Sequence, residues 1–183
     1  FGSAGDTYPN LTNASAMFMN DKNLQSINGR QGKAVLSDYP NLQNASGMFW
    51  GCDKLVSLEL NAPTVTNFYG TFYLCSEIRM VEGEVVFNEN LTNAYNILGD
   101  AKLDIASFFK VYEKLKVLPL SPGDGNGCVA HIGVDSSCKE AILAQLGELT
   151  GGFGGQTRIH KSVEERDAWD AGTNTHWIAI KWN

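Results

Sequence analysis

One sequence pattern recurs along the N-terminal half of the chain. It reads NASAMFMNDKNL from Asn13, NASGMFWGCDKL from Asn44 and NFYGTFYLCSEI from Asn67, with Asn first, Phe sixth and Leu or Ile twelfth. A weaker copy, around Asn93, lacks the Phe. The four Asn residues are 31, 23 and 26 residues apart, close to the period of about 20 to 29 residues of leucine-rich repeats. Such repetition predicts stacked units that bury one another's apolar edges.

The second copy predicts a short helix followed by a short strand. Four side chains at spacings i, i+1, i+4 and i+7 fall on one face of a helix, namely Met48, Phe49, Cys52 and Leu55. The Leu-x-Leu pair at Leu58 and Leu60 then follows the two-residue period of a strand. We therefore expect an α/β fold, a leucine-rich-repeat solenoid whose right-handed helix-turn-strand coils pair their strands into a parallel sheet. The polar insertion NGRQGKAVLSD, before the second copy, predicts a loop.

Stacked coils place equivalent residues in ladders. One predicted ladder is buried and satisfies unpaired backbone groups in the turns, and it consists of Asn13, Asn44, Asn67 and Asn93. The other is apolar and consists of Phe18, Phe49 and Phe72.

Toward the C-terminus, the sequence predicts helices and strands in place of the repeat pattern. Asp104 predicts the N-cap of a helix over Ile105–Leu115, and Asp135 or Ser136 predicts the N-cap of a second helix. Further expected elements are a turn at 121–127, a strand at 128–134, the second helix at 138–149, a Gly-rich turn at 151–155, a strand at 157–162, a helix at 163–172 and a strand at 175–182. We predict repeat coils over residues 1–120 and α/β capping units, continuous with them, over 121–183.

These repeats resemble the BspA-like leucine-rich repeat surface proteins of gut and oral bacteria, whose units carry the motif MF-x-x-C-x-x-L-x-x-L-x-L. Residues 48–60 match this motif in full, whereas Thr71 replaces its Met in the third copy and Asp21 replaces its Cys in the first. The C-terminal segments also resemble the ends of such proteins from Bacteroidetes and their phages. The resemblance implies a surface-exposed or secreted protein with a role in adhesion or recognition, and it identifies no ligand.

The sequence allows several interpretations of the four cysteines. Cys52 and Cys75 occupy equivalent inward positions, so they are interpreted as buried free thiols, with a ladder disulfide or a reactive thiol as alternatives. Cys128 and Cys138 flank a predicted strand and could pair. No Cys-x-x-Cys spacing predicts a zinc site.

No other pattern indicates chemistry. The histidines His131, His160 and His176 are scattered over three predicted strands, whereas catalysis or metal binding needs convergent groups. The segment GDGNG offers Asp124 and Asn126 but lacks the further carboxylates of a calcium loop. We therefore predict no catalytic residue, metal or cofactor, and no enzymatic activity.

Charge and hydropathy restrict the partners. The net charge of −6 without a run of Lys or Arg disfavours nucleic acid. No apolar stretch reaches the roughly 18 to 20 residues of a membrane span. The chain starts at Phe1 without a leader, which suggests a mature form or a fragment.

Aromatic residues at non-core positions are the best candidates for partner contacts. Trp50 and Tyr73 directly follow the repeated Phe in neighbouring copies, and Tyr69 is close by. They either contact a partner or shield the helix layer. Ser57 and Glu59, between the leucines, would line the concave face.

The leading hypothesis is a non-enzymatic adhesion module of a bacterial cell-surface or secreted protein that binds a protein or glycan of a host or bacterium. The alternative is a structural or receptor-binding protein of a phage virion or tail.

Overall fold

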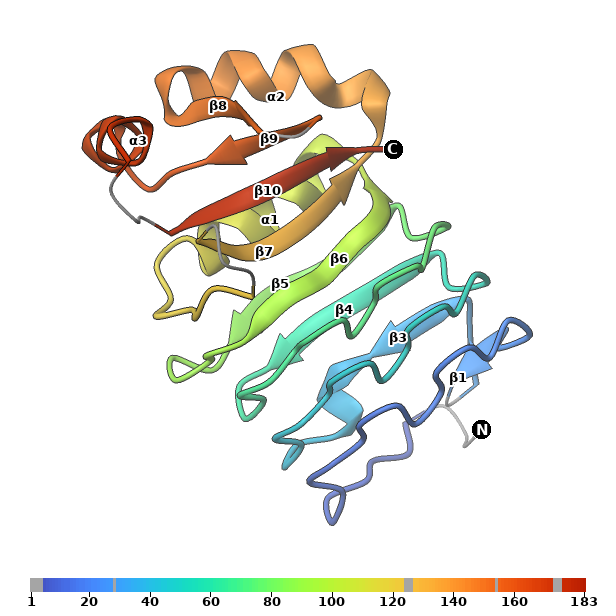
Figure 1. Ribbon diagram of the computed structural model, residues 1–183. Coiled ribbons are helices and arrows are strands. Elements are labelled where there is room, and N and C mark those ends of the chain that lie inside the picture. The colour runs from blue at the N-terminus through green and yellow to red at the C-terminus, as the bar shows by residue number, and fades with distance from the viewer. Residues whose placement is uncertain (1–4, 28, 124–126, 154, 173–175) are drawn as a thin grey trace.

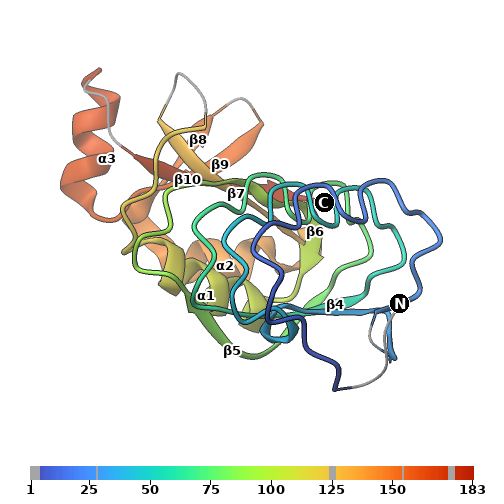
Figure 2. The same cartoon turned by 90° about the horizontal axis from the view of Figure 1, so that it is seen from below.

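The computed structural model describes residues 5–27, 29–123, 127–153, 155–172 and 176–183. Its elements form two layers (Figures 1 and 2). They are β1 (Ser26–Ile27), β2 (Arg30–Gln31), β3 (Lys33–Val35), β4 (Ser57–Ala62), β5 (Met80–Phe87), β6 (Ala94–Leu103), α1 (Ile105–Leu115), β7 (Cys128–Val134), α2 (Lys139–Leu146), β8 (Thr150–Phe153), β9 (Gln156–Ile159), α3 (Val163–Asp170) and β10 (Trp177–Trp182), with short 3₁₀ helices at 36–38, 136–138 and 147–149.

The strands belong to three sheets of different kinds. β1 and β2 form an antiparallel pair, and β3, β4 and β5 form a parallel sheet. The third sheet has the order β6-β7-β10-β9-β8 and is mixed, because β6, β7 and β10 run parallel while β9 and β8 pair antiparallel. The fold is therefore mixed α/β, and the prediction of a leucine-rich-repeat solenoid is wrong.

The repeated segments are not helical, which is the main error in that prediction. Residues 15–20, 46–51 and 69–74 form successive turns. The cause is a left-handed residue at every fourth position, with φ of 61° at Gly47 and 73° at Gly51, and 59° at both Gly70 and Leu74. A right-handed helix needs φ near −60° throughout, so each of these residues reverses the winding of the chain.

Along each turn segment, successive backbone N–H groups donate in alternation to a carbonyl of the same turn and to a carbonyl of the neighbouring unit. Met48 N donates to Ala45 O at 3.0 Å within its own turn. The next residue, Phe49, instead donates its N–H to Thr71 O of the following unit at 2.9 Å. Gly47 and Gly51 also donate to the following unit. Each turn segment is thereby joined edge to edge with its neighbour, as strands are in a sheet.

Both predicted ladders are present. Parallel bridges link Asn13 to Asn44, Asn44 to Asn67 and Asn67 to Asn93. Each Asn Oδ1 accepts a hydrogen bond from the backbone N–H two residues later, at 3.0 to 3.2 Å. These Asn residues are exposed or half-buried, however, so the expectation that they are buried is wrong. The Phe rings stack at centroid distances of 5.3 Å, from Phe18 to Phe49 and from Phe49 to Phe72.

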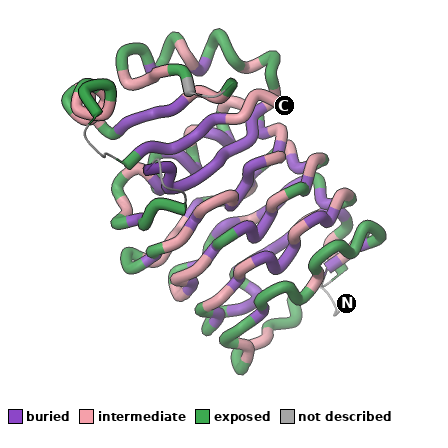
Figure 3. Tube along the Cα trace, viewed as in Figure 1, coloured by how far each residue is buried: buried purple, intermediate pink, exposed green. Residues whose placement is uncertain are grey.

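The turn segments extend the mixed sheet beyond β6. Gly70 N donates to Tyr95 O at 2.9 Å and Phe72 N donates to Ile97 O at 3.0 Å, so the third turn segment lies against β6. Figure 2 shows this layer above the parallel sheet and α1. The core fills the space between the layers, and Phe49, Phe72 and Leu58 are fully buried. Figure 3 shows buried stretches along the strands of both layers. The strands after Leu58 and after Ile78 are neighbours, as expected.

The C-terminal elements largely follow the predictions. Helix α1 has the predicted bounds, and the carboxylate of its N-cap, Asp104, accepts a hydrogen bond from Ser107 N at 2.7 Å. β7, α3 and β10 are confirmed, and Asp135 caps the 3₁₀ turn before α2. The predicted loop before the second repeat is wrong, because it contains β2 and β3, and β8 covers residues 151–153 of the predicted Gly-rich turn. Residues 124–126 of the predicted turn lie outside the described residues.

The proposed boundary at residue 120 remains a prediction. β6, on its N-terminal side, pairs directly with β7, on its C-terminal side.

Candidate binding surfaces

The outer surface of the turn segments exposes apolar side chains. Met19, Tyr69 and Leu74 are 41%, 39% and 43% exposed, and Trp50 and Tyr73 beside them are half-buried. We call these five residues the turn-face patch. All five lie on backbone that is joined across the units by hydrogen bonds, so the side chains are presented by a rigid support.

Glycines in the next unit leave space for the largest side chains of the patch. A Cβ atom on Gly70 would lie 3.0 Å from Cε3 of Trp50, and one on Gly99 would lie 3.4 Å from Cδ2 of Tyr73. The Trp50 and Tyr73 rings meet edge to face at 4.7 Å, which confirms that they lie side by side. Lys181 Nζ lies 5.4 Å from the centre of the Tyr73 ring. Trp50 thus packs on its own layer and also keeps part of its ring at the surface.

Tyr69 extends the aromatic surface toward the mixed sheet. Its ring stacks on Tyr95 with centroids 6.2 Å apart, and Tyr95 meets the His131 ring at 4.8 Å. The sequence did not indicate Tyr95 as part of this surface, because the fourth copy of the repeat is irregular.

The two residues predicted for the concave face lie on β4 and are engaged within the fold. Ser57 is only 5% exposed, and hydrogen bonds from Lys33 and Ser57 lower the pKa of the Glu82 carboxyl. Glu59 is half-buried and accepts hydrogen bonds from Ser37 Oγ at 2.7 Å and from Asn61 N at 2.8 Å. Ser57 is therefore not placed to contact a partner.

The repeat cysteines are free thiols inside the core, which confirms the leading interpretation. Cys52 Sγ donates to Phe18 O at 3.1 Å, and Cys75 Sγ donates to Phe49 O at 2.9 Å. Burial raises the pKa of both thiols to about 12. Neither is a thiolate near neutral pH, and the thiolate is the nucleophilic form. The proposed pair of Cys128 and Cys138 is also not formed.

The three histidines do not converge on one site, although His160 and His176 both line the small cavity described below. His131 Nε2 lies 3.7 Å from Cys128 Sγ. His160 follows β9 and accepts a hydrogen bond at Nε2 from Arg158 Nε at 3.1 Å. Burial, followed by the charge of Arg158, lowers the pKa of His160. Within the described ranges, no three His, Cys, Asp or Glu side chains are grouped to hold a metal. Asp124 and Asn126 lie outside these ranges.

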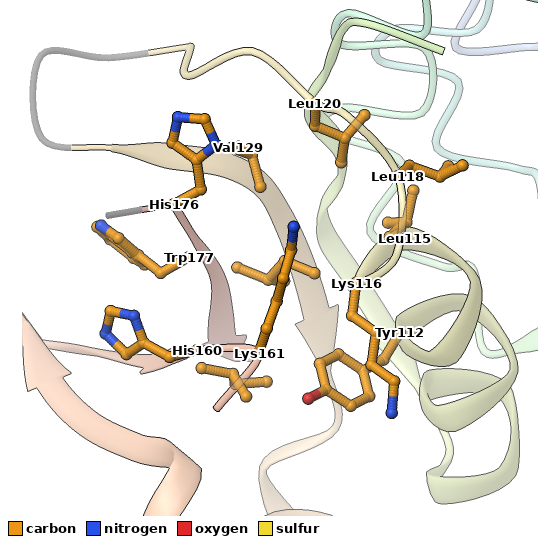
Figure 4. A pocket seen from close by; sticks show the side chains of 12 residues that line it. Tyr112, Leu115, Lys116, Leu118, Leu120, Val129, His160, Lys161, His176 and Trp177 are labelled. Atoms are coloured by element: carbon orange, nitrogen blue, oxygen red, sulfur yellow. The ribbon is translucent and has the colours of Figure 1, made fainter. Parts of the chain in front are cut away.

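A small cavity separates α1 from β7, β9 and β10 (Figure 4). Tyr112 enters it from α1 (Figure 4), and Val129, Ile159 and Ile178 line it from the strands of the mixed sheet. His160, His176 and Trp177 are also among its lining residues. The buried Tyr112 hydroxyl has no hydrogen-bond partner among the described residues, and burial raises the pKa of this hydroxyl to about 12. The cavity volume is about 10 Å³, which admits about one water molecule. It is too small for an organic ligand.

An open groove lies at the loop ends of the repeat units and has a volume of about 630 Å³. Its lining consists of Pro9, Asn10, Thr12, Asn41, Gln43, Pro63, Thr64, Thr66 and Asn88. We call it the polar groove. Sequence reasoning missed it, although the repeated Tyr-Pro-Asn-Leu at 8–11 and 39–42 marks two of its loops.

Comparisons of the chain with models of protein families, with curated proteins and with solved structures found no match in any of the three. The resemblance to BspA-like proteins therefore remains a prediction. Among the described helices, none combines the length and the apolar composition that crossing a membrane requires.

Proposed function

We propose that this chain is a non-enzymatic binding module of a bacterial cell-surface or secreted protein, and that it recognises a macromolecule of a host or of another bacterium. The observation that carries the proposal is the turn-face patch. Clustered exposed aromatic, methionine and leucine side chains are typical of contact surfaces. Tyr and Trp bring a large contact area with little loss of conformational freedom, and Met adapts to the shape of a partner.

The support under the patch favours binding over a purely structural role. Neighbouring turn segments are joined by backbone hydrogen bonds of 2.8 to 2.9 Å, such as those from Gly47 to Tyr69 and from Phe49 to Thr71. A surface held in this way loses little entropy when a partner binds, because its backbone is already ordered. The raised thiol pKa values of Cys52 and Cys75 argue against nucleophilic catalysis.

Binding of the labelled chain to intact cells tests the proposal. The fluorescently labelled protein is titrated onto epithelial cells and onto Bacteroidetes cells, and bound fluorescence is measured by flow cytometry. We expect saturable binding that the unlabelled chain displaces. Absence of saturable binding to every cell type would contradict an adhesion role. Binding to bacterial cells alone, with tail or capsid genes beside the coding sequence, would favour the phage alternative.

Two matched variants assign the binding to the patch. Tyr69→Ala removes an exposed aromatic side chain from the patch, and Val117→Ala removes an apolar side chain that is 71% exposed after α1. We expect Tyr69→Ala to weaken binding about tenfold or more, as for a contact residue worth more than about 1.4 kcal/mol. Val117→Ala should bind like the unaltered chain. Equal affinity of both variants would assign the binding to another surface.

A further inference from the structure

The polar groove is built by loops that the stacking of the units places side by side. Gln43 N donates to Thr12 O at 2.8 Å, and Thr66 N donates to Gln43 O at 2.9 Å. These three residues therefore follow one another in register across the units. Their side chains line one continuous groove, together with those of Asn10 and Asn41.

Some lining groups hold the groove in shape, and others are open to a ligand. Asn41 Nδ2 donates to Pro9 O at 2.8 Å, and Thr64 Oγ1 donates to Leu42 O at 2.8 Å, so these side chains tie neighbouring loops together. In contrast, the exposed side chains of Asn10, Thr12 and Gln43 make no hydrogen bond to the part of the chain that the structure describes.

The chemistry of the lining is uniform. Each of the nine lining side chains is uncharged, and the polar ones carry only hydroxyl or carboxamide groups. A carboxamide presents a donor and an acceptor next to each other, and a hydroxyl group acts as both. Such a surface pairs with neighbouring hydroxyl groups of a ligand and offers no counter-charge to an ionic one.

An aromatic ring lies beside the groove. A second hollow of about 420 Å³, lined by residues 7–11, shares Pro9 and Asn10 with the groove. Tyr8 lines this hollow, and its ring stacks on Tyr39 with centroids 5.5 Å apart. The half-buried Tyr8 ring thus packs against Tyr39 and lines a hollow that adjoins the groove at Asn10.

We propose that the polar groove binds a neutral oligosaccharide. Adjacent sugar hydroxyls pair with the carboxamides of Asn10 and Gln43 and with the Thr12 hydroxyl, and the C–H face of a sugar ring packs on Tyr8. The groove volume of about 630 Å³ lies within the range of about 300 to 1,000 Å³ for ligand sites. This site shares no residue with the turn-face patch, so the proposal does not depend on binding at that patch.

Nuclear magnetic resonance titration of the full chain tests this assignment. The probes are cellohexaose, maltohexaose, mannohexaose and chitohexaose, each at millimolar concentration, with a heparin hexasaccharide as the charged comparison. We expect at least one neutral probe to shift the amide signals of residues 8–12, 41–43 and 64–66 and to leave those of residues 69–74 in place. The heparin probe should leave the groove signals unchanged.

The variant Asn10→Ala/Gln43→Ala removes two exposed side chains that make no hydrogen bonds within the fold, so its unfolding temperature should be unchanged. Its affinity for the binding probe should fall about threefold to tenfold, as for one or two lost hydrogen bonds, and Val117→Ala should have no effect. Three results would each overturn the proposal: no response to any neutral probe, shifts confined to residues 69–74, or undiminished affinity of the double variant.

Discussion

Exchanging Gly and Ala at the left-handed positions of the repeat units should change the free energy of unfolding. The sign of each change is opposite to the sign expected in a helix. Gly47 and Ala16 occupy equivalent positions, with φ of 61° and 56°. A left-handed conformation costs a residue with a Cβ atom about 1 to 2 kcal/mol, and replacing Gly by Ala recovers about 0.4 to 1 kcal/mol through the unfolded state. A new Cβ at Gly47 would lie 2.9 Å from Cε of Met19, the flexible end of an exposed side chain, so this contact adds little.

We therefore expect Gly47→Ala to lower the free energy of unfolding by about 1 kcal/mol and the reciprocal Ala16→Gly to raise it by a similar amount. If the segments were helical, both signs would reverse, because Ala is favoured over Gly in a helix by about 1 kcal/mol. Urea unfolding followed by circular dichroism measures both changes, with an unchanged m-value as the control for the two-state assumption. A stabilised Gly47→Ala variant together with a destabilised Ala16→Gly variant would refute the turn conformation.

Three further predictions concern single groups. Thr71→Val should lower the free energy of unfolding by about 1 to 2 kcal/mol, because Thr71 Oγ1 donates to Ala45 O of the preceding unit at 2.8 Å; an unchanged urea midpoint would show that this bond contributes nothing. Among the four thiols, Cys138 is half-buried and the others are buried, so a thiol reagent should modify Cys138 first, as peptide mapping would show. The pKa of His160 is lowered in the folded chain, so on acidification His160 binds a proton first in the unfolded chain. The free energy of unfolding should therefore fall as the pH drops below about 6.5, the ordinary pKa of histidine. His160→Gln should reduce this loss, and an equal loss in that variant would assign it to other groups.

The sequence predicted which side chains are buried in the repeats better than it predicted their backbone. In a helix, side chains four residues apart point to the same side. The same holds in turns that have a left-handed residue at every fourth position. Met48 and Cys52 therefore point inward in either structure, and the burial pattern does not distinguish the two. The glycines do distinguish them, because Gly47 and Gly51 are spaced four apart and glycine is the residue that most readily adopts positive φ.

The candidate surfaces were predicted in part, for a related reason. The repeat placed Trp50 beside Tyr73, because equivalent positions in stacked units are neighbours. The repeated Tyr-Pro-Asn-Leu at 8–11 and 39–42 marks two loops of the polar groove but does not indicate binding, since uncharged Asn, Thr and Pro residues are also ordinary turn residues. Ser57 was misplaced because alternation along a strand does not show whether its second face is covered, and this residue is buried in β4.

Both proposed binding surfaces depend on turn units that are joined edge to edge by backbone hydrogen bonds. Scalar couplings across hydrogen bonds, measured by nuclear magnetic resonance, detect these bonds directly. We predict a correlation between the amide nitrogen of Phe49 and the carbonyl carbon of Thr71, because Phe49 N lies 2.9 Å from Thr71 O. A correlation from Phe49 to the carbonyl carbon of Ala45, four residues earlier as in a helix, would contradict it.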